Sequence, residues 1–327
     1  MGTKKYTYLP IILLLAFLFT SCLKKENPLP PLESGDIETV QIEIGYPYRN
    51  QVYYSCETNK TLKTNTKYDW DLSFECSPTG FHILLNTAKG EFMTNKGNIP
   101  FSSVNSITGV NWDWDLPNGN LDSTVTNNWK GTNNVYILNR QFNENGSHLG
   151  YKKIQFISVS NTNYIFRHAN LDGSNEKTDT IIKNPNLNFI HFSFQNNGKT
   201  LELEPNKNNW DLLFTNHYHK FSNLSMPFVL TQVLINKHNG VVVSESNTNN
   251  FNSITLKDTG KNIFSNDWNV IGYDWKTRNS QDNSFTIDPN KSYILKTING
   301  FFYKIRFVDF YNSLGKKGYP KFEIQRL

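Results

Sequence analysis

Apolar and polar residues alternate along several short stretches of this chain. Clear examples are residues 41–44 (Gln-Ile-Glu-Ile), 200–203 (Thr-Leu-Glu-Leu) and 304–307 (Lys-Ile-Arg-Phe). Such alternation places apolar side chains on one face of a strand and polar side chains on the other. Turn-forming pairs such as Asn145-Gly146 separate these stretches at hairpin intervals, and no long segment shows an apolar period of 3.6 residues. The pattern therefore predicts an all-β, mostly antiparallel fold.

The pentapeptide Trp-Asp-Leu-x-Phe occurs twice, at residues 70–74 and 210–214. Each copy is preceded by an aromatic strand and followed, in the same order, by an apolar run closed by Asn, a tryptophan-containing segment and a Tyr-x-Leu strand. A repeated order of this kind indicates one structural module used twice. We therefore expect two tandem β modules, at residues 38–172 and 186–327. Trp, Leu and Phe of each pentapeptide share one strand parity, which predicts that all three point into the module core.

The amino-terminal residues predict a bacterial lipoprotein signal. Two lysines precede an apolar run at residues 9–19, and Thr-Ser-Cys follows directly. The run is shorter than the roughly 20 apolar residues that span a bilayer, and its surroundings are typical of a secretory signal. We expect a signal peptide at residues 1–21, lipid (palmitate) attachment at Cys22 and a Pro-rich tether at 22–37. The expected location is the outer membrane, on either its periplasmic or its extracellular face.

The charge balance and the motifs exclude several function classes. Without residues 1–21 the chain carries 31 basic and 28 acidic residues, a net charge of +3. Nucleic acid is not an expected partner, because its binding needs a clustered basic face. No nucleophile elbow, His-Glu-x-x-His motif or phosphate-binding loop is present, so we do not expect an enzyme. Asp71 and Asp211 occupy the same repeated position, which favours a structural role over a pair of catalytic carboxylates.

Two cysteines remain besides Cys22. If Leu62 lies opposite Trp70 in an antiparallel pair, then Cys56 lies opposite Cys76. An exported protein can oxidise such a pair, and the closed loop of about twenty residues would stabilise the fold by roughly 3 kcal/mol. The sequence therefore favours a structural disulfide between Cys56 and Cys76. The alternative is two buried free thiols.

The second module resembles the HmuY family of lipoproteins from Bacteroidota. The resemblance is strongest over residues 188–327 and rests on segments 209–214, 293–296, 303–311 and 315–322. It implies an all-β fold, haem as the cofactor, and an outer-membrane receptor as the partner in haem uptake. It also implies that two His or Met side chains from loops of one module hold the iron. The segments that match the two ligand loops of the family, 241–272 and 278–290, contain neither His nor Met.

The two modules differ between the pentapeptide and the apolar run that follows. The second module has ten additional residues there, and they include His217, His219 and Met226, with His238 just after the next strand. Histidine and methionine are ligands of haem iron, and added loops often carry binding residues. We therefore predict that these four residues form the candidate haem site.

His217 and His219 share one face of an extended strand, opposite the parity of Trp210. We expect both rings to point to solvent or to a ligand. A solvated loop and a metal site that uses both histidines are the alternatives. The other four histidines, by contrast, are expected at the surface: His82, His148, His168 and His191.

The predicted function is therefore that of an outer-membrane-anchored lipoprotein that binds haem or a related tetrapyrrole for uptake. The alternative is a surface interaction lipoprotein that binds a glycan or a protein partner on the same scaffold, without haem. The first module is either a spacer or a second site.

Overall fold

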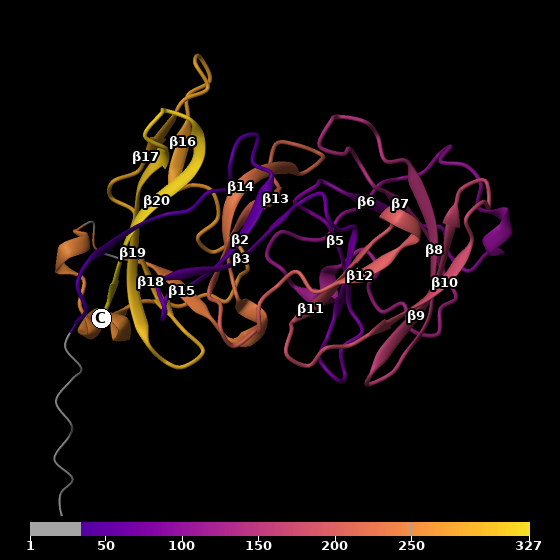
Figure 1. The fold of residues 1–327 in the computed structure, drawn as a ribbon, viewed down its shortest axis with the longest axis horizontal. Coiled ribbons are helices and arrows are strands. Elements are labelled where there is room, and N and C mark those ends of the chain that lie inside the picture. The colour runs from indigo at the N-terminus through magenta and orange to yellow at the C-terminus, as the bar shows by residue number, and fades with distance from the viewer. Residues whose placement is uncertain (1–33, 247, 249) are drawn as a thin grey trace, which may run out of the picture. The chain divides into compact units, whose positions relative to one another are not determined.

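Antiparallel strands form nearly all of the regular structure, which confirms the predicted all-β fold (Figure 1). The computed structural model describes residues 34–327 except 247 and 249, and residues 34–327 belong to one compact unit. The predicted signal peptide 1–21 and the lipid site Cys22 lie outside the described residues, as does most of the tether 22–37.

The first sandwich consists of two sheets that enclose one apolar core. Its five-stranded sheet has the order β10-β9-β8-β7-β6, with bounds Lys177–Ile182, Asn163–Asn170, Tyr151–Val159, Val135–Asn139 and Phe92–Asn95. Its four-stranded sheet has the order β12-β11-β4-β5, with bounds Lys199–Leu201, Phe189–Ser193, Leu72–Glu75 and Ile83–Leu85.

The second sandwich has a five-stranded and a four-stranded sheet around its own core. The five-stranded sheet has the order β1-β20-β19-β18-β15, with bounds Glu38–Gln41, Lys317–Arg326, Phe302–Tyr311, Tyr293–Lys296 and Val242–Glu245. The four-stranded sheet has the order β14-β13-β2-β3, with bounds Phe228–Ile235, Leu212–His219, Asn50–Ser55 and Lys60–Thr66. A separate hairpin is formed by β16 (Lys276–Arg278) and β17 (Phe285–Ile287).

Six short 3-10 helices connect the described strands. They are η2 (Phe101–Ser103), η3 (Leu121–Ser123), η4 (Gln195–Asn197), η5 (Lys237–Asn239), η6 (Phe251–Ser253) and η7 (Leu256–Lys261). The two four-stranded sheets lie next to each other in the middle of the unit, and the five-stranded sheets lie outside them (Figure 1).

The two sandwiches have the same strand order, but their strands come from different parts of the chain. Strand β2 pairs with β13, with Tyr54 opposite Leu212, and β11 pairs with β4, with Phe192 opposite Leu72. Each pentapeptide strand is therefore paired with the aromatic strand that precedes the other pentapeptide. This pairing does not follow the predicted division into residues 38–172 and 186–327. The second sandwich is completed by β1, β2 and β3 from the beginning of the described chain.

The prediction that the pentapeptide side chains point into a core is correct for Leu and Phe. Leu72 and Phe74 lie in the first core, and Leu212 and Phe214 lie in the second. The prediction was wrong for the tryptophans, because β4 and β13 begin only at the Leu. Both tryptophan rings instead lie between the two four-stranded sheets.

The predicted disulfide was also wrong. Cys56 and Cys76 are free and buried, and they belong to the second and the first core respectively. The prediction assumed that Leu62 lies opposite Trp70 in one antiparallel pair. Leu62 instead lies in β3, which pairs with β2, so the two thiols never face each other.

Candidate functional site

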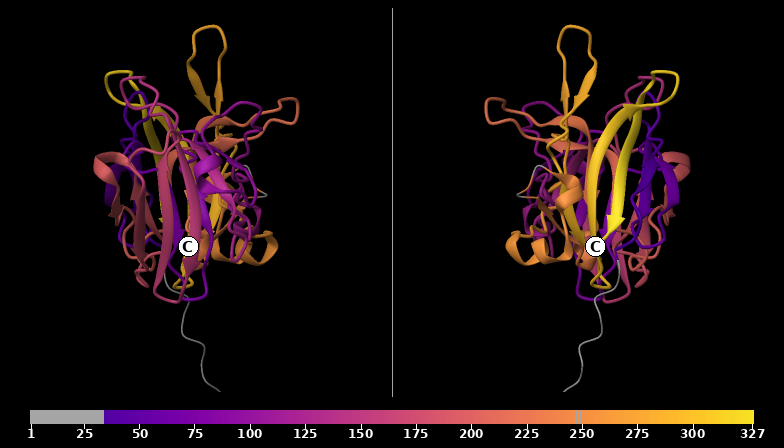
Figure 2. Two further views of the ribbon diagram at one scale, coloured as in Figure 1. Left: turned by 90° about the vertical axis from the view of Figure 1, so that its right-hand side faces the viewer. Right: turned by 90° about the vertical axis from the view of Figure 1, so that its left-hand side faces the viewer.

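The predicted insertion lengthens a hairpin. Strands β13 and β14 pair in one continuous register, from Leu212 opposite Ile235 to His219 opposite Phe228. The corresponding strands of the first sandwich, β4 and β5, have only four and three residues. Most of the additional residues are therefore strand, and the remainder form loop 220–227. This loop and the β16–β17 hairpin project at the same end (Figure 2).

His217 has the predicted parity but is not available to a ligand. Its side chain is buried, because the first sandwich covers this face of the sheet. Its Nδ1 accepts a hydrogen bond from Thr87 Oγ1 at 2.7 Å, and its Nε2 donates to Pro117 O at 2.9 Å. Burial lowers the pKa of His217 to about 4. The expectation that His217 faces solvent or a ligand was therefore wrong, and the same holds for a metal site shared with His219.

His219 lies at the outer end of the hairpin among aromatic rings. The ring centroids of Phe221 and Tyr273 are each 4.4 Å from the centroid of His219. Phe228, opposite His219, lies 6.1 Å from Phe221. His219 is half-buried, and burial lowers its pKa below the usual value. Neither of its ring nitrogens has a hydrogen-bond partner among the residues that the structure describes. His219 is thus free to bind a metal centre.

Tyr273 is held beside His219 by the turn that precedes it. The backbone of Gly272 exchanges two hydrogen bonds with Val233 of β14, at 2.9 and 3.1 Å. Gly272 has a φ of +60°, and a Cβ atom there would lie 2.9 Å from Asn269 O. Only glycine fits this turn without a shift of the backbone. The site residues that sequence reasoning missed are Tyr273, Phe221 and Phe228, although Tyr273 lies in one of the repeated segments.

Apolar side chains are exposed around this cluster. Phe228 is 52% exposed and Met226 is 37% exposed, and Leu224 of the same loop is also exposed. Contiguous exposed apolar groups commonly mark a ligand or partner site. The predicted residue Met226 therefore lies in the same hairpin end as His219.

His238 lies at the opposite end of β14. It belongs to η5, after Ile235, whereas His219 pairs with Phe228 at the start of the strand. The eight residues of β14 span roughly 20 Å, so His238 and His219 cannot bind one iron. The ring of His238 packs against Phe189 and Trp268, and burial lowers its pKa to about 3.

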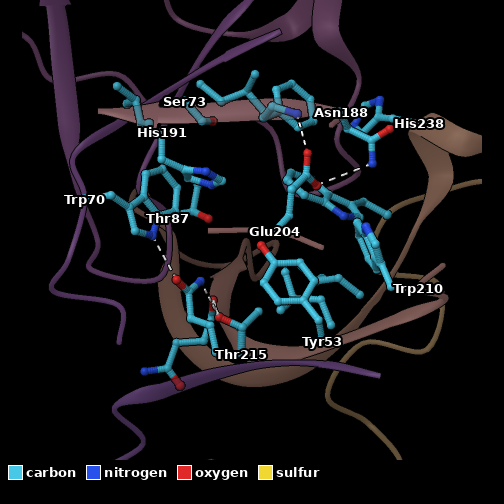
Figure 3. Close-up of a pocket in the computed structure, with 18 residues that line it drawn as sticks. Tyr53, Trp70, Ser73, Thr87, Asn188, His191, Glu204, Trp210, Thr215 and His238 are labelled. Carbon is cyan, nitrogen blue, oxygen red and sulfur yellow. Dashed lines mark hydrogen bonds between the residues drawn. The ribbon is translucent and has the colours of Figure 1, made fainter. Parts of the chain in front are cut away.

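A cavity of about 40 Å³ lies between the two four-stranded sheets (Figure 3). Its lining includes the polar side chains of Glu204, His191 and His238 and the rings of Trp70 and Trp210. Burial raises the pKa of Glu204 to about 8 and lowers that of His191 to about 3. The expected surface positions of His191 and His168 were therefore wrong, because both side chains are buried. The volume suits a few water molecules and is far too small for a tetrapyrrole.

The repeated aspartates are both buried but differ in their partners. Asp71 binds Lys89 Nζ at 2.6 Å and Arg140 Nε at 3.0 Å. Burial opposes ionisation of Asp71, but these two cations hold its pKa well below the usual range. The Asp211 carboxylate accepts the backbone N–H of Cys56 at 2.7 Å, also contacts the Cys56 thiol, and has no ion pair with a cation in the described structure. Burial raises its pKa to about 7. Each carboxylate thus serves its own sandwich.

Two further features are absent from the part of the chain that the structure describes. No group of three or more His, Cys, Asp or Glu side chains there is arranged to hold a metal ion. None of the helices in this part is long and apolar enough to cross a bilayer.

Comparison with known proteins identifies the family. The family model described as HmuY protein matches residues 47–324. Two solved structures that are similar to this chain are apo PinO from Porphyromonas gingivitis and the apo HmuY analog TFO from Tannerella forsythia. PinO is 11% identical with a TM-score of 0.36, and the match covers 89% of this chain and 97% of PinO. TFO is 12% identical with a TM-score of 0.27, and the match covers 90% of this chain and 96% of TFO.

A search of curated proteins found no match. The family model extends from the loop before β2 into β20 and so covers strands of both sandwiches. The resemblance seen in residues 188–327 is therefore part of a longer match, and the chain belongs to the HmuY family.

Proposed function

We propose that this chain is an outer-membrane-anchored lipoprotein that binds haem or a related tetrapyrrole for uptake. The binding site is the outer end of the β13–β14 hairpin, with His219 as the iron ligand and Met226 as the candidate second ligand. The observation that carries the proposal is the imidazole of His219, which has no hydrogen-bond partner among the described residues and lies against the rings of Phe221 and Tyr273.

The chemistry of this hairpin end suits a flat, apolar macrocycle that contains iron. Imidazole and thioether groups are axial ligands of haem, and aromatic rings pack well against planar partners. The exposed side chains of Phe228 and Met226 provide apolar surface beside the histidine. The lowered pKa of His219 keeps its ring neutral, as ligation requires, at neutral pH and somewhat below.

The site also touches one of the two segments that correspond to ligand loops of the family. Segment 241–272 ends at the turn that places Tyr273 against His219. In this chain, His219 comes from the lengthened β13–β14 hairpin, and the ring of Tyr273 comes from the residue that directly follows segment 241–272. This arrangement supports a haem site although segment 241–272 contains no His or Met.

The lipid anchor at Cys22 and a haem-uptake receptor complete the proposal. Most of the tether precedes residue 34, and β1 begins at Glu38 on the edge of the outer sheet of the second sandwich. The anchored chain would therefore lead directly into the sandwich that carries the site.

The experiment is a haemin titration of lipid-free residues 32–327, followed by absorption spectroscopy. We expect a saturable, red-shifted Soret band at one equivalent, which His219→Ala abolishes and Met226→Leu shifts. His148→Ala is the matched control, because His148 is exposed on the other sandwich, and it should leave the spectrum unchanged. No spectral change with the unsubstituted protein would refute haem binding.

The alternative function is a surface interaction lipoprotein that binds a glycan or a protein without haem. One observation favours it, namely a row of exposed and half-buried aromatic rings on the first sandwich. A flat haemin titration together with saturable binding of a glycan or a protein would favour this alternative.

A further inference from the structure

Four aromatic rings form a continuous row on the first sandwich. The centroid distances are 5.3 Å from Phe142 to His148, 5.1 Å from His148 to Tyr151 and 5.9 Å from Tyr151 to Trp112. Phe142 and His148 are exposed, and Tyr151 and Trp112 are half-buried. We call these four residues the aromatic row. Single exposed aromatic residues are common, but a contiguous group marks an interaction surface.

The exposed half of the row is held by a well-bonded turn between β7 and β8. The Nδ1 of His148 accepts a hydrogen bond from Gly150 N at 3.1 Å, so its Nε2 donates to Asn139 Oδ1 at 3.0 Å. The Oδ1 of Asn143 accepts a hydrogen bond from Ser147 N at 2.9 Å. Phe142 and His148 also form a β-bridge with each other. The ring of His148 and the backbone of Phe142 are therefore fixed before any ligand binds.

The beginning of the same turn is anchored in the protein interior. Arg140 lies directly after β7, and its Nε is 3.0 Å from the buried carboxylate of Asp71. Farther along, Glu144 forms an ion pair with Arg49 at 2.9 Å. Binding to a surface that is already ordered costs little conformational entropy.

The inner half of the row combines apolar faces with free polar atoms. Trp112 and Tyr151 lie in nearly parallel planes, 14° apart, and pack against a small core cluster that includes Phe101 and Val135. Within the described residues, neither Trp112 Nε1 nor the Tyr151 hydroxyl has a hydrogen-bond partner. These two groups can therefore bond to a ligand without breaking a bond within the protein.

We propose that the aromatic row is a binding site for a neutral oligosaccharide chain. The faces of aromatic rings carry negative potential, which attracts the weakly positive C–H groups on the face of a sugar ring. The indole N–H and the phenol hydroxyl provide hydrogen bonds to sugar hydroxyls. No Lys or Arg side chain stacks on any of these four rings in the described structure, and Glu144 in the turn is neutralised by Arg49. A neutral ligand thus fits better than an anionic one.

The repeat of the row also matches a chain of sugars. Successive rings are 5.1 to 5.9 Å apart, and their planes differ by 72°, 54° and 14° along the row. The rings therefore present both faces and edges, and an extended ligand of several sugar units contacts more than one of them. The first sandwich would then act as a glycan-binding module in its own right, independent of haem binding by the second sandwich.

The test is isothermal titration of lipid-free residues 32–327 with a fixed panel of neutral hexasaccharides. The panel contains β-linked glucose, xylose and N-acetylglucosamine and α-linked mannose. We expect saturable binding of at least one hexasaccharide. Trp112→Ala should weaken that binding about tenfold or more, because a stacked ring and a hydrogen bond are lost together.

Two further variants separate a loss of binding from a loss of folding. Phe142→Ala removes a ring that is 50% exposed, so the fold should remain intact while affinity falls several-fold. Tyr46→Ala removes an exposed ring from the second sandwich and should leave affinity unchanged. The proposal is overturned if no hexasaccharide binds, or if binding is unaffected by both Trp112→Ala and Phe142→Ala. It is also overturned if the row mediates self-association in sedimentation experiments while sugars do not bind.

Discussion

The Nδ1 atom of His217 lies 2.7 Å from Oγ1 of Thr87 and accepts its hydroxyl hydrogen, which links β13 of the second sandwich to the turn after β5 of the first. The other ring nitrogen is bonded to Pro117 of the first sandwich. Burial lowers the pKa of His217 to about 4, so the ring is neutral at pH 7 and can accept this bond. His217 therefore has the strand parity that we expected for a ligand, but it is part of the interface between the two sandwiches.

Thr87→Val tests this interface directly. The substitution keeps the shape of the side chain but leaves Nδ1 of His217 buried without a partner. An unsatisfied buried group of this kind costs about 1–3 kcal/mol of unfolding free energy. Urea denaturation measures the loss, and Thr200→Val on the exposed surface of β12 is the control, expected within about 0.5 kcal/mol of the unsubstituted protein. Equal stability of the two variants would contradict the assigned role.

We expect the same Asp→Asn substitution to lower the free energy of unfolding by very different amounts at the two repeated aspartates. Asp71→Asn removes the carboxylate that pairs with Lys89 and Arg140 in the interior. Lys89 keeps its ion pair with Glu91 at 2.8 Å, but Arg140 is left without a carboxylate, which should lower the free energy of unfolding by about 3–5 kcal/mol. Asp211→Asn leaves no cation unpaired, and the amide oxygen can still accept the N–H of Cys56. Its cost should stay below about 1 kcal/mol. The free energies of unfolding would be measured by chemical denaturation at pH 7. Similar decreases for both variants would show that the buried ion pairs of Asp71 do not contribute to stability as proposed.

The exchange of strands predicts that the second half of the chain does not fold alone. A fragment of residues 186–327 lacks β1, β2 and β3 and should show no cooperative thermal unfolding. The backbone N–H of Gly35 donates to Arg326 O, so a short linker can join the end of residues 208–327 to the start of 34–66. This permuted chain should unfold cooperatively. Cooperative unfolding of 186–327 by itself would refute the strand assignment.

Burial of Glu204 makes stability depend on pH. Its pKa is raised from the ordinary 4.5 to about 8 by burial, so the folded state holds a proton that the unfolded state releases. Stability therefore falls as pH rises from about 4.5 to about 8, with a slope of up to ~1.4 kcal/mol per pH unit from this group. Glu204→Gln cannot ionise, so its stability relative to the unsubstituted protein should increase over that window. A constant difference in the free energy of unfolding between Glu204→Gln and the unsubstituted protein from pH 5 to pH 8 would contradict the prediction.

Local patterns predicted the strands but not their partners. Alternation identifies the strand at Lys304–Phe307 because one face of an antiparallel sheet is buried. An aromatic strand precedes each pentapeptide at the same distance. The sequence pattern therefore allows each pentapeptide strand to pair with either of the two aromatic strands. Only packing of the whole unit decides that Tyr54 pairs with Leu212. The disulfide prediction failed for the same reason.

The candidate site was predicted only in part because strand parity does not reveal what covers a face. Parity placed His217 and His219 correctly on one face of β13. The first sandwich covers that face at His217, whereas only neighbouring rings surround His219. Tyr273 had a sequence signal, since it belongs to a repeated segment. Its position beside His219 depends on the Gly272 turn, which the repeat does not indicate.

Replacement of the His219 ring by free imidazole is the most direct test of whether His219 ligates haem iron. The absorption spectrum of haemin-loaded residues 32–327 would be compared with that of His219→Ala before and after addition of imidazole. We expect the variant to lose the low-spin spectrum and imidazole to restore it. A low-spin spectrum that persists in His219→Ala without imidazole would contradict the assignment of His219 as the ligand.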